Sequence, residues 1–260
     1  MGAVTEGPVS GIGLIDLHCH LLPGLDDGSK NRETTRAMAK AMALEGVTGV
    51  VCTPHCTAGD PRLGERIANI RMALEEWKET LALEQLPLWL YPGMELLCTP
   101  DLPGTLACGD VLPLAGSRYL LIEFSFDSLH EQMEWAIRQV RQAGFVPVLA
   151  HPERYTAVWR DPERVADWFF QGTVIQLDQD SVLGRFGQHC ARTSDWILRH
   201  GLAHVVASDA HGLGSRTARL KPLFQQLARR YGRGYAEVLL LENPMRILRD
   251  RELVPPAREE

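Results

Sequence analysis

A short segment near the N-terminus concentrates side chains that bind metal ions. It reads IDLHCHLLPGLDDGS and contains His18, His20 and Asp27. Side chains alternate across a strand, so the two histidines of HCH point to the same side and the intervening cysteine points to the other. Imidazole and carboxylate ligands together suit Mn²⁺, Fe²⁺ or Zn²⁺. A single histidine pair is more often structural than a ligand site, so the prediction depends on whether similar residues recur.

Residues of the same types do recur, at the ends of other strand-like runs. The segments CTPHC, YPGMEL, LLIEFSF, LAHPERY and ASDAHG supply, in chain order, His55, Glu95, Glu123, His151, Asp209 and His211. The last two have D-x-H spacing, so both side chains point the same way. Nine candidate ligands exceed the needs of one ion. We therefore expect two or three ions bridged by carboxylates.

Seven apolar, β-branched runs alternate with helical segments along the chain. The runs are Leu14–His20, Gly49–Pro54, Leu88–Glu95, Tyr119–Phe124, Pro147–His151, Val174–Leu177 and Val205–Ser208. Repeated strand–helix alternation implies parallel strands joined by right-handed crossovers. The pattern predicts an α/β barrel one unit short of the eight-unit (β/α) barrel. Catalytic residues of such barrels lie at the C-terminal ends of the strands, which would bring the recurring ligands to one rim.

Composition narrows the class of protein. The chain has 260 residues, is 45% hydrophobic and carries a net charge of −6 without a Lys/Arg block, which disfavours nucleic-acid binding. No apolar stretch approaches the roughly 20 residues of a transmembrane helix, and residues 1–13 do not resemble a signal peptide. Six cysteines without a CxxC pair are typical of reduced thiols, so we expect a cytoplasmic protein. We expect a flexible lead-in at residues 1–13, one barrel domain at 14–250 and a tail at 251–260.

The motifs quoted above resemble, in order and spacing, those of the PHP (polymerase and histidinol phosphatase) superfamily. Within it they are most similar to the bacterial manganese-dependent protein-tyrosine phosphatases of capsule and exopolysaccharide synthesis. The resemblance runs from about Ile15 to Leu248 and implies a distorted (β/α)₇, TIM-like barrel around three metal ions. The implied ligand sets are His18, His20, Glu95 and Asp209 for the first ion, Glu95, Glu123 and His151 for the second, and Asp27, His55 and His211 for the third.

The resemblance also implies two catalytic residues that bind phosphate, Arg154 of HPER and Arg216 of GSR. Guanidinium groups fit phosphate oxygens well, which would let a protein of net charge −6 accept an anion. The implied cofactor is Mn²⁺, as two or three ions, with Fe²⁺ or Zn²⁺ as alternatives. The implied reaction is attack of a metal-activated hydroxide on the phosphorus of a phosphotyrosine protein, in particular the tail of an autophosphorylated tyrosine kinase. Homo-oligomer formation is left open.

One segment departs from the family pattern. After the sixth predicted strand, where the family has neutral residues, the chain has Asp178 and Asp180. These carboxylates would either repel a phosphate or contact the groups that support the site. Nearby, Tyr155 and Trp159 follow the fifth strand, where they would either flank an aromatic substrate or belong to the core.

Three other interpretations of the sequence compete with a metal-dependent tyrosine phosphatase. Cys56 to Arg62 fits the C-x5-R loop of cysteine-dependent phosphatases, but Asp60 would place negative charge in the phosphate cradle and Pro61 lacks an N–H donor. A small-molecule phosphatase of the histidinol-phosphate type would share the barrel. A non-catalytic metal-binding scaffold that docks a kinase would share the ligands. The LPGLDDGS opening and the arginines favour the tyrosine phosphatase.

Overall fold

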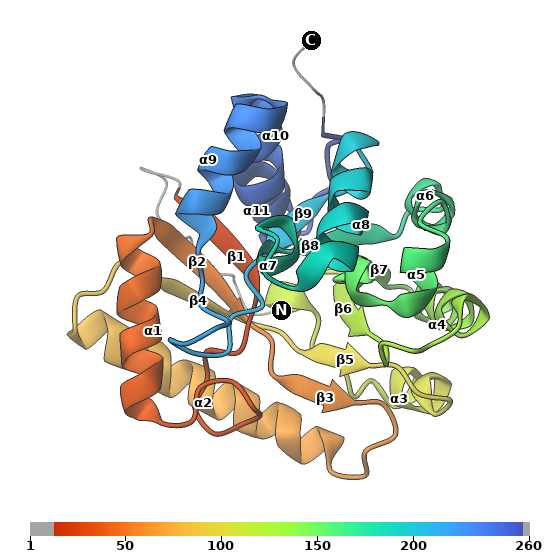
Figure 1. Cartoon of the computed structure of the whole chain (residues 1–260). Helices are drawn as coiled ribbons and strands as arrows, with labels where there is room; N and C mark the ends of the chain where they lie inside the picture. The colour runs from red at the N-terminus through yellow and green to blue at the C-terminus, as the bar shows by residue number, and fades with distance from the viewer. Residues whose placement is uncertain (1–12, 257–260) are drawn as a thin grey trace.

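Parallel strands form the wall of a barrel, and the helices surround that wall on its outer side (Figure 1). The computed structural model describes residues 13–256. One sheet has three strands in the order β1 (Leu14–Cys19), β2 (Val47–Cys52) and β4 (Trp89–Pro92). The second sheet has the order β3 (His55–Thr57), β5 (Glu95–Leu97), β6 (Tyr119–Glu123), β7 (Val146–Ala150), β8 (Val174–Asp178) and β9 (Val205–Ala207).

The last strand of the second sheet, β9, contacts the first strand, β1, and so closes the barrel. Cys19 at the end of β1 forms a parallel bridge with Ala210, just beyond β9. The His20 N–H donates to the Ala210 carbonyl (2.9 Å), and the Asp209 N–H donates to the His18 carbonyl (2.9 Å). The predicted fold class, a distorted seven-unit (β/α) barrel, is confirmed. The closure also aligns the ends of β1 and β9, where four of the candidate ligands lie.

One of the seven predicted strands is broken, so the prediction of a continuous strand there was wrong. The run Leu88–Glu95 becomes β4 and, from Glu95 on, β5, whereas the run Gly49–Pro54 corresponds to β2 and is followed by a separate strand, β3. Proline lacks the N–H that a continuous ladder needs, and Pro54 and Pro92 stand at or next to the gaps between β2 and β3 and between β4 and β5. After each gap the chain continues in the other sheet. There β3 pairs with β5, and His55 lies opposite Glu95.

The helices pack their apolar faces on the barrel. Along α2, the side chains of Ile70, Leu74 and Trp77 are almost completely buried, and burying such a side chain contributes about 1.5–3 kcal/mol. The helices are α1 (Arg32–Leu44), α2 (Leu63–Leu83), α3 (Leu102–Cys108), α4 (His130–Gln142), α5 (Thr156–Arg160), α6 (Arg164–Phe170), α7 (Gln179–Val182), α8 (Gly187–Arg199), α9 (Leu220–Tyr231), α10 (Arg233–Glu237) and α11 (Asn243–Leu248).

The predicted terminal segments are only partly visible. The expected lead-in, residues 1–13, lies outside the described residues except for Gly13, and residues 257–260 of the expected tail lie outside them too. Residues 251–256 form neither helix nor strand. Within residues 13–256, no helix has the length and apolar character needed to cross a membrane. All six cysteines fall inside this range and are free thiols.

His204, just before β9, provides a test of stability at the end of the barrel away from the candidate ligands. Its Nδ1 accepts a hydrogen bond from the Ile175 N–H (3.0 Å), and its ring stacks on Phe169 with centroids 4.5 Å apart. Burial lowers the pKa of His204 from 6.5 to about 4. Between those pH values the unfolded chain binds a proton that the folded protein does not, so stability is present above pH 6.5 and is lost as the pH falls toward 4.

We therefore expect the contribution of His204 to the free energy of unfolding to fall by about 2–3 kcal/mol when the pH is lowered from 7 to 4.5. Urea unfolding of the wild type and of His204→Gln at both pH values measures this contribution as a difference. The variant should lose less stability on acidification than the wild type. Equal losses in the two proteins would contradict the lowered pKa of His204, because all other titrating groups are common to both.

Candidate metal centre

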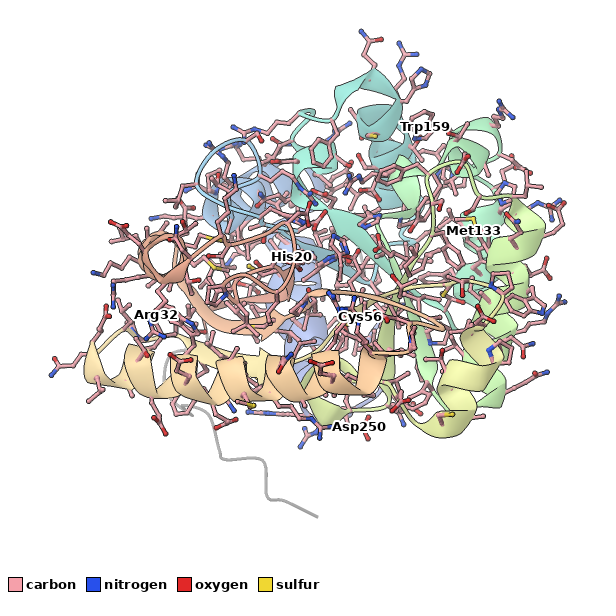
Figure 2. The ribbon with its side chains drawn as sticks, turned by 90° about the horizontal axis from the view of Figure 1, so that it is seen from below. His20, Arg32, Cys56, Met133, Trp159 and Asp250 are labelled. Atoms are coloured by element: carbon pink, nitrogen blue, oxygen red, sulfur yellow. The ribbon has the colours of Figure 1, made fainter. Side chains whose placement is uncertain are left out.

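Seven of the nine candidate ligands lie near the C-terminal ends of strands or in the loops beyond them, and the other two, His55 and Glu95, begin the short strands β3 and β5 that follow β2 and β4. Figure 2 places His20, one of these ligands, near the middle of the molecule, whereas Asp250 lies at its edge. The ligands come from β1, β3, β5 and β6 and from the loops after β1, β7 and β9, and they are His18, His20, Asp27, His55, Glu95, Glu123, His151, Asp209 and His211. The predicted shared rim is therefore present in the fold.

The most deeply buried group contains His18, His20, Glu95 and Asp209. Each offers one ligand atom, and these atoms all lie within 4.8 Å of one another. The His18 Nε2 atom is 3.1 Å from Glu95 Oε2 and 3.3 Å from Asp209 Oδ1. The His20 Nε2 atom is 3.3 Å from each of the same two oxygens. The group has the same members as the ligand set that the resemblance implies for the first ion.

A second group is centred on both oxygens of Glu95. Its Oε2 is 3.0 Å from His55 Nδ1, which lies 2.9 Å from Glu123 Oε1. Its Oε1 is 2.9 Å from His151 Nε2, whereas His151 Nε2 is 4.0 Å from Glu123 Oε2. Glu95 thus lies between two groups, where a bridging carboxylate is expected. The compact triad is His55, Glu95 and Glu123, so His55 stands where the resemblance places His151.

A third group lies toward the surface and contains His20, Asp27, His55 and His211. Asp27 Oδ1 is 3.4 Å from the Nε2 atoms of both His55 and His211. The Asp27 side chain is 69% exposed, so this group opens to solvent. It contains the predicted third set and adds His20. The members of the first and third predicted sets therefore lie together, whereas His151 of the second set belongs to none of the three groups. Which residue coordinates which ion stays a prediction.

Several buried atoms of this cluster have no hydrogen-bond partner of acceptable geometry. They include Glu95 Oε2, Asp209 Oδ1 and His211 Nε2. An unsatisfied buried polar atom costs about 1–3 kcal/mol, and more when it is charged. Divalent cations would satisfy these oxygen and nitrogen donors, which are of the types that Mn²⁺, Fe²⁺ and Zn²⁺ accept. The residues present therefore fit a metal centre.

The electrostatics of the cluster favour bound cations. Burial opposes ionisation of Glu95, but the charge of His18 and hydrogen bonds with neighbouring histidines hold its pKa well below the usual range. Burial also opposes protonation of His20, but its close contacts with the carboxylates of Asp209, Asp26 and Glu95 raise its pKa well above the usual range. Glu95 thus stays charged, and a proton on His20 helps to balance that charge. A metal ion would replace that proton.

Two polar residues that the sequence analysis did not identify hold the first histidines in place. The His20 Nδ1 atom is 2.6 Å from Asp26 Oδ2, and the His18 Nδ1 atom is 2.9 Å from Gln176 Oε1. Burial raises the pKa of Asp26, but the hydrogen bond and charge of His20 outweigh it and lower that pKa to about 2. Such contacts fix the ring orientation of metal-ligating histidines.

Two candidate ligands have an unusual backbone. His151 has φ 35° and Asp209 has φ 48°, in the left-handed region that residues other than glycine rarely adopt. Such strained residues cluster at functional sites, where the surrounding structure holds them. Gly28 shows a related constraint in the LDDGS segment. A Cβ there would lie 2.5 Å from the His20 carbonyl oxygen, so only glycine allows this loop to fold back on β1.

The two predicted phosphate-binding arginines border the buried group. Arg154 Nη1 lies 2.9 Å from Asp209 Oδ2, and Arg216 Nη2 contacts the same oxygen. The two side chains are 16% and 25% exposed, so part of each guanidinium is accessible from solvent. Both cations therefore stand at the edge of the ligand cluster, where an anionic substrate would enter. Their role in binding phosphate stays a prediction.

The two additional carboxylates contact arginines. Asp178 is buried with its Oδ2 3.5 Å from Arg154 Nη1, and its Oδ1 accepts from the Asp180 N–H at the start of α7. Asp180 Oδ1 lies 3.5 Å from Arg185 Nη1. Asp178 thus contacts a predicted phosphate-binding arginine and Asp180 contacts an arginine outside the predicted site, and their effect on a bound phosphate stays a prediction.

Of the two aromatic residues after the fifth predicted strand, Tyr155 belongs to the core and Trp159 is partly exposed. Tyr155 is fully buried, and its hydroxyl donates to the Ala150 carbonyl (3.0 Å). The Trp159 Nε1 donates to the Glu153 carbonyl (2.5 Å), and its ring stacks on His189. The substrate-flanking interpretation is therefore wrong for Tyr155, and Trp159 is engaged by other partners.

The C-x5-R segment lacks an activated cysteine. Cys56 lies in β3 and is only 2% exposed. Burial raises the pKa of its thiol to about 11, although Arg66 partly opposes this. A nucleophilic cysteine needs a lowered pKa and access to substrate. Arg62, the arginine of the motif, is instead exposed at the start of α2.

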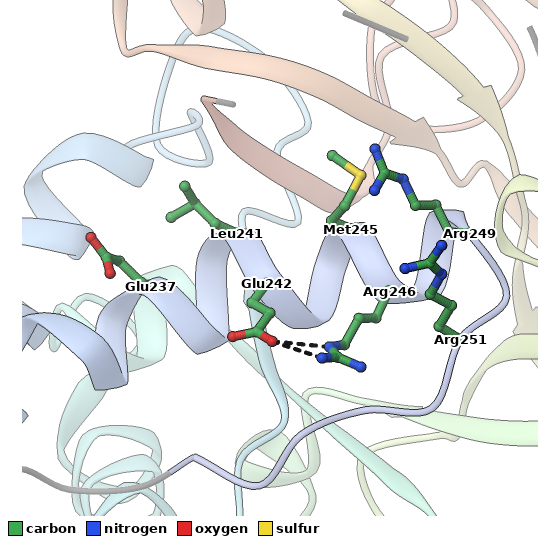
Figure 3. A pocket seen from close by; sticks show the side chains of 7 residues that line it. All are labelled: Glu237, Leu241, Glu242, Met245, Arg246, Arg249 and Arg251. Carbon is green, nitrogen blue, oxygen red and sulfur yellow. Dashed lines mark hydrogen bonds and ion pairs between the residues drawn. The ribbon is translucent and has the colours of Figure 1, made fainter. Parts of the chain in front are cut away.

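A different pocket lies at the other end of the barrel. It has a volume of about 370 Å³ and is lined by Glu237, Leu241, Glu242, Met245, Arg246, Arg249 and Arg251 (Figure 3). The pocket is near the N-terminal end of β6, because the hydroxyl of Tyr119, the first residue of β6, donates to the carbonyl of Arg251 (2.7 Å). No residue of the predicted site lines this pocket.

Comparison with known proteins gives a consistent result. Residues 14–249 match the model of a family described as capsular polysaccharide synthesis, CpsB/CapC. The chain is 30% identical over 240 residues to the tyrosine-protein phosphatase YwqE of Bacillus subtilis (strain 168), covering 92% of this chain and 93% of that protein. It is 29% identical over 248 residues to the tyrosine-protein phosphatase CpsB of Streptococcus pneumoniae, covering 92% and 99%.

Solved structures agree with these sequence matches. One described as YwqE from Bacillus subtilis and CpsB from Streptococcus pneumoniae, unique metal-dependent tyrosine phosphatases, superposes with a TM-score of 0.82. It is 29% identical, and the match covers 95% of this chain and 99% of that one. A β-aspartyl dipeptidase from Fervidobacterium islandicum AW-1 is 14% identical with a TM-score of 0.54, which indicates a shared fold only.

Proposed function

Because this chain belongs to the CpsB/CapC family of capsular polysaccharide synthesis, we propose that it is a metal-dependent tyrosine-protein phosphatase. One observation carries the proposal. Three overlapping groups of metal-ligating side chains lie at the strand ends, and two arginines stand at the edge of the most buried group. The relatives named above are described as tyrosine phosphatases, and the solved pair as metal-dependent.

The residues of the site would have three separate roles in hydrolysing a phosphomonoester. Divalent ions bound here would supply a nucleophilic hydroxide at neutral pH and offset the negative charge of the phosphate. The histidines and carboxylates hold those ions, and Asp26 and Gln176 orient two of the histidines. Arg154 and Arg216 bind the non-bridging oxygens, since a guanidinium presents paired donors in the geometry of a phosphate.

We further propose Mn²⁺ as the cofactor, with Fe²⁺ or Zn²⁺ as alternatives, because the mixed nitrogen and oxygen donors suit this group of ions. The proposed substrate is a phosphotyrosine protein, in particular the tail of an autophosphorylated bacterial tyrosine kinase. The names of the relatives, which give tyrosine-protein phosphatase activity, and the family description, which gives capsular polysaccharide synthesis, support this substrate class. Free thiols at all six cysteines support a cytoplasmic location.

One experiment separates this function from its alternatives. The protein, stripped of metal and then supplied with or without Mn²⁺, is assayed on a phosphotyrosine peptide and on histidinol phosphate. A tyrosine phosphatase hydrolyses the peptide with the higher kcat/KM and only with metal. Preference for histidinol phosphate would assign the small-molecule activity instead. Failure to hydrolyse either compound with metal bound would leave the non-catalytic scaffold.

A substitution of Cys56 tests the cysteine mechanism. We expect Cys56→Ser to keep most of the activity, because the wild-type thiol is buried and its pKa is raised to about 11. The measurement is kcat/KM on the phosphotyrosine peptide beside metal content and thermal stability. An inactive variant that is folded and metal-loaded would reinstate a cysteine nucleophile.

A further inference from the structure

We propose that Phe126 binds the aromatic ring of the substrate and so makes the site selective for aryl phosphates. The inference rests on the proposed phosphatase function and adds a residue that selects the substrate class. Phe126 follows β6 in the loop after Glu123, and its side chain is 49% exposed. A large apolar ring open to solvent beside a charged cluster is the feature to be explained.

Phe126 lies directly beside the residues that would hold phosphate and metal. Its ring centroid is 4.7 Å from the Arg154 Cζ atom and 6.3 Å from the ring of His151. Its carbonyl accepts from the Thr156 N–H (2.8 Å), which ties this loop to the start of α5. In phosphotyrosine one oxygen separates phosphorus from the ring. A phosphate held by Arg154 therefore places that ring within a few ångströms of the arginine, where Phe126 stands.

Of the other aromatic side chains near the site, Phe186 and Trp159 are only partly exposed. Tyr155 is fully buried. Among the described residues, the other exposed large aromatic side chains are Trp89 and Phe170. Trp89 begins β4, at the opposite end of the barrel, and Phe170 ends α6, where it packs on Phe169. Phe126 alone among these exposed rings contacts a residue of the predicted site.

Phe186 provides a matched control. Its ring centroid is also 4.7 Å from Arg154 Cζ, so both rings support the guanidinium through cation–π contacts. Phe186 is only partly exposed, at the start of α8. Loss of either ring removes one contact to Arg154. Loss of Phe126 alone should also remove a contact to the substrate ring.

The experiment measures inhibition by phenylphosphonate and methylphosphonate, which present the same anionic group with and without a ring. Wild type, Phe126→Leu, Phe126→Tyr and Phe186→Leu are compared as metal-loaded proteins, and hydrolysis of a phosphotyrosine peptide serves as the assay. In Phe126→Leu, the preference for phenylphosphonate should fall roughly three- to tenfold, the scale of one aromatic pair. Phe126→Tyr should keep the preference, and Phe186→Leu should weaken both inhibitors by the same factor.

The outcomes separate the inference from the function on which it rests. If Phe126→Leu weakens both inhibitors equally, or neither, Phe126 does not bind the substrate ring and the proposal is overturned. An equal loss of preference in Phe186→Leu would also overturn it, because the effect would then arise from Arg154. Failure of the metal-loaded wild type to hydrolyse the peptide would instead refute the proposed function. Metal content and thermal stability of each variant confirm that it is folded.

Discussion

Removal of divalent ions with a chelator is expected to abolish hydrolysis of phosphotyrosine by this protein, and Mn²⁺ is expected to restore it. The reason is the composition of the cluster at the strand ends. Within the proposed site, the side chains nearest the buried carboxylates are histidines and two arginines, and none is an activated serine or cysteine nucleophile. Full activity in a sample shown by elemental analysis to be free of metal would refute the metal mechanism.

Substitutions in the same cluster should reduce metal content and rate together. His18→Ala and Glu95→Gln each remove a ligand from the group whose atoms lie within 4.8 Å of one another. Glu95 contacts histidines through both oxygens, so Glu95→Gln should lower the occupancy of more than one ion. Metal analysis of each purified variant, beside its kcat/KM with excess Mn²⁺, measures both effects. Normal metal content in both variants would exclude them as ligands.

Substitution of Asp26 should weaken metal binding less than substitution of a candidate ligand does. Its carboxylate holds the Nδ1 atom of His20 and accepts from the His55 N–H (3.0 Å), but it belongs to none of the three ligand groups. Loss of such a supporting contact typically costs 10- to 100-fold in metal affinity. We therefore expect Asp26→Asn to need more Mn²⁺ for half-maximal activity, with a rate at saturation closer to the wild type than that of His18→Ala. An unchanged Mn²⁺ requirement would show that Asp26 does not support the ligands.

The candidate ligands could be identified from sequence because similar residues recur where the predicted strands end. The H-x-H spacing places His18 and His20 on one side of the chain at the end of β1. Asp209 and His211 lie beyond β9, and Asp209 has a left-handed φ of 48°, so strand alternation does not account for the D-x-H pair. Parallel strands then bring all strand ends to one rim. Grouping of the ligands was less predictable. His55 pairs with Glu95 because β2 and β3 separate at Pro54, and apolar periodicity does not show such a break.

Apart from Asp26, which lies only six positions from His20, the supporting residues that could not be predicted from sequence contact their partners across long distances in the chain. Gln176 reaches His18 over 158 positions, and Asp16 accepts from the Ser208 N–H over 192 positions. Ligating histidines commonly bond a carboxylate through their second nitrogen, which could have directed attention to Asp26 beside Asp27. No comparable signal marks Gln176 or Phe126. Their roles depend on which loops meet, and packing of the whole barrel decides that.

Replacing either phosphate-binding arginine should reduce activity strongly while leaving the metal ions in place. In Arg154→Ala and Arg216→Ala, a charge-assisted contact that tightens in the transition state is lost. The expected fall in kcat/KM is on the order of 10²-fold or more, the scale seen when one preorganised donor is removed. Lysine at either position should recover only part of the rate, because an ammonium restores the charge without the planar fork of donors.

Arg249→Ala is the matched control for both arginine variants. Arg249 lines the pocket at the opposite end of the barrel (Figure 3), so its removal changes net charge equally but leaves the site intact. Its kcat/KM on the phosphotyrosine peptide should equal that of the wild type. A similar loss in all three variants would indicate a general effect of charge on substrate attraction, which salt would screen. Near-normal kcat/KM in both Arg154→Ala and Arg216→Ala would show that neither binds phosphate, and the argument for a phosphatase would then rest on the metal centre and the relatives alone.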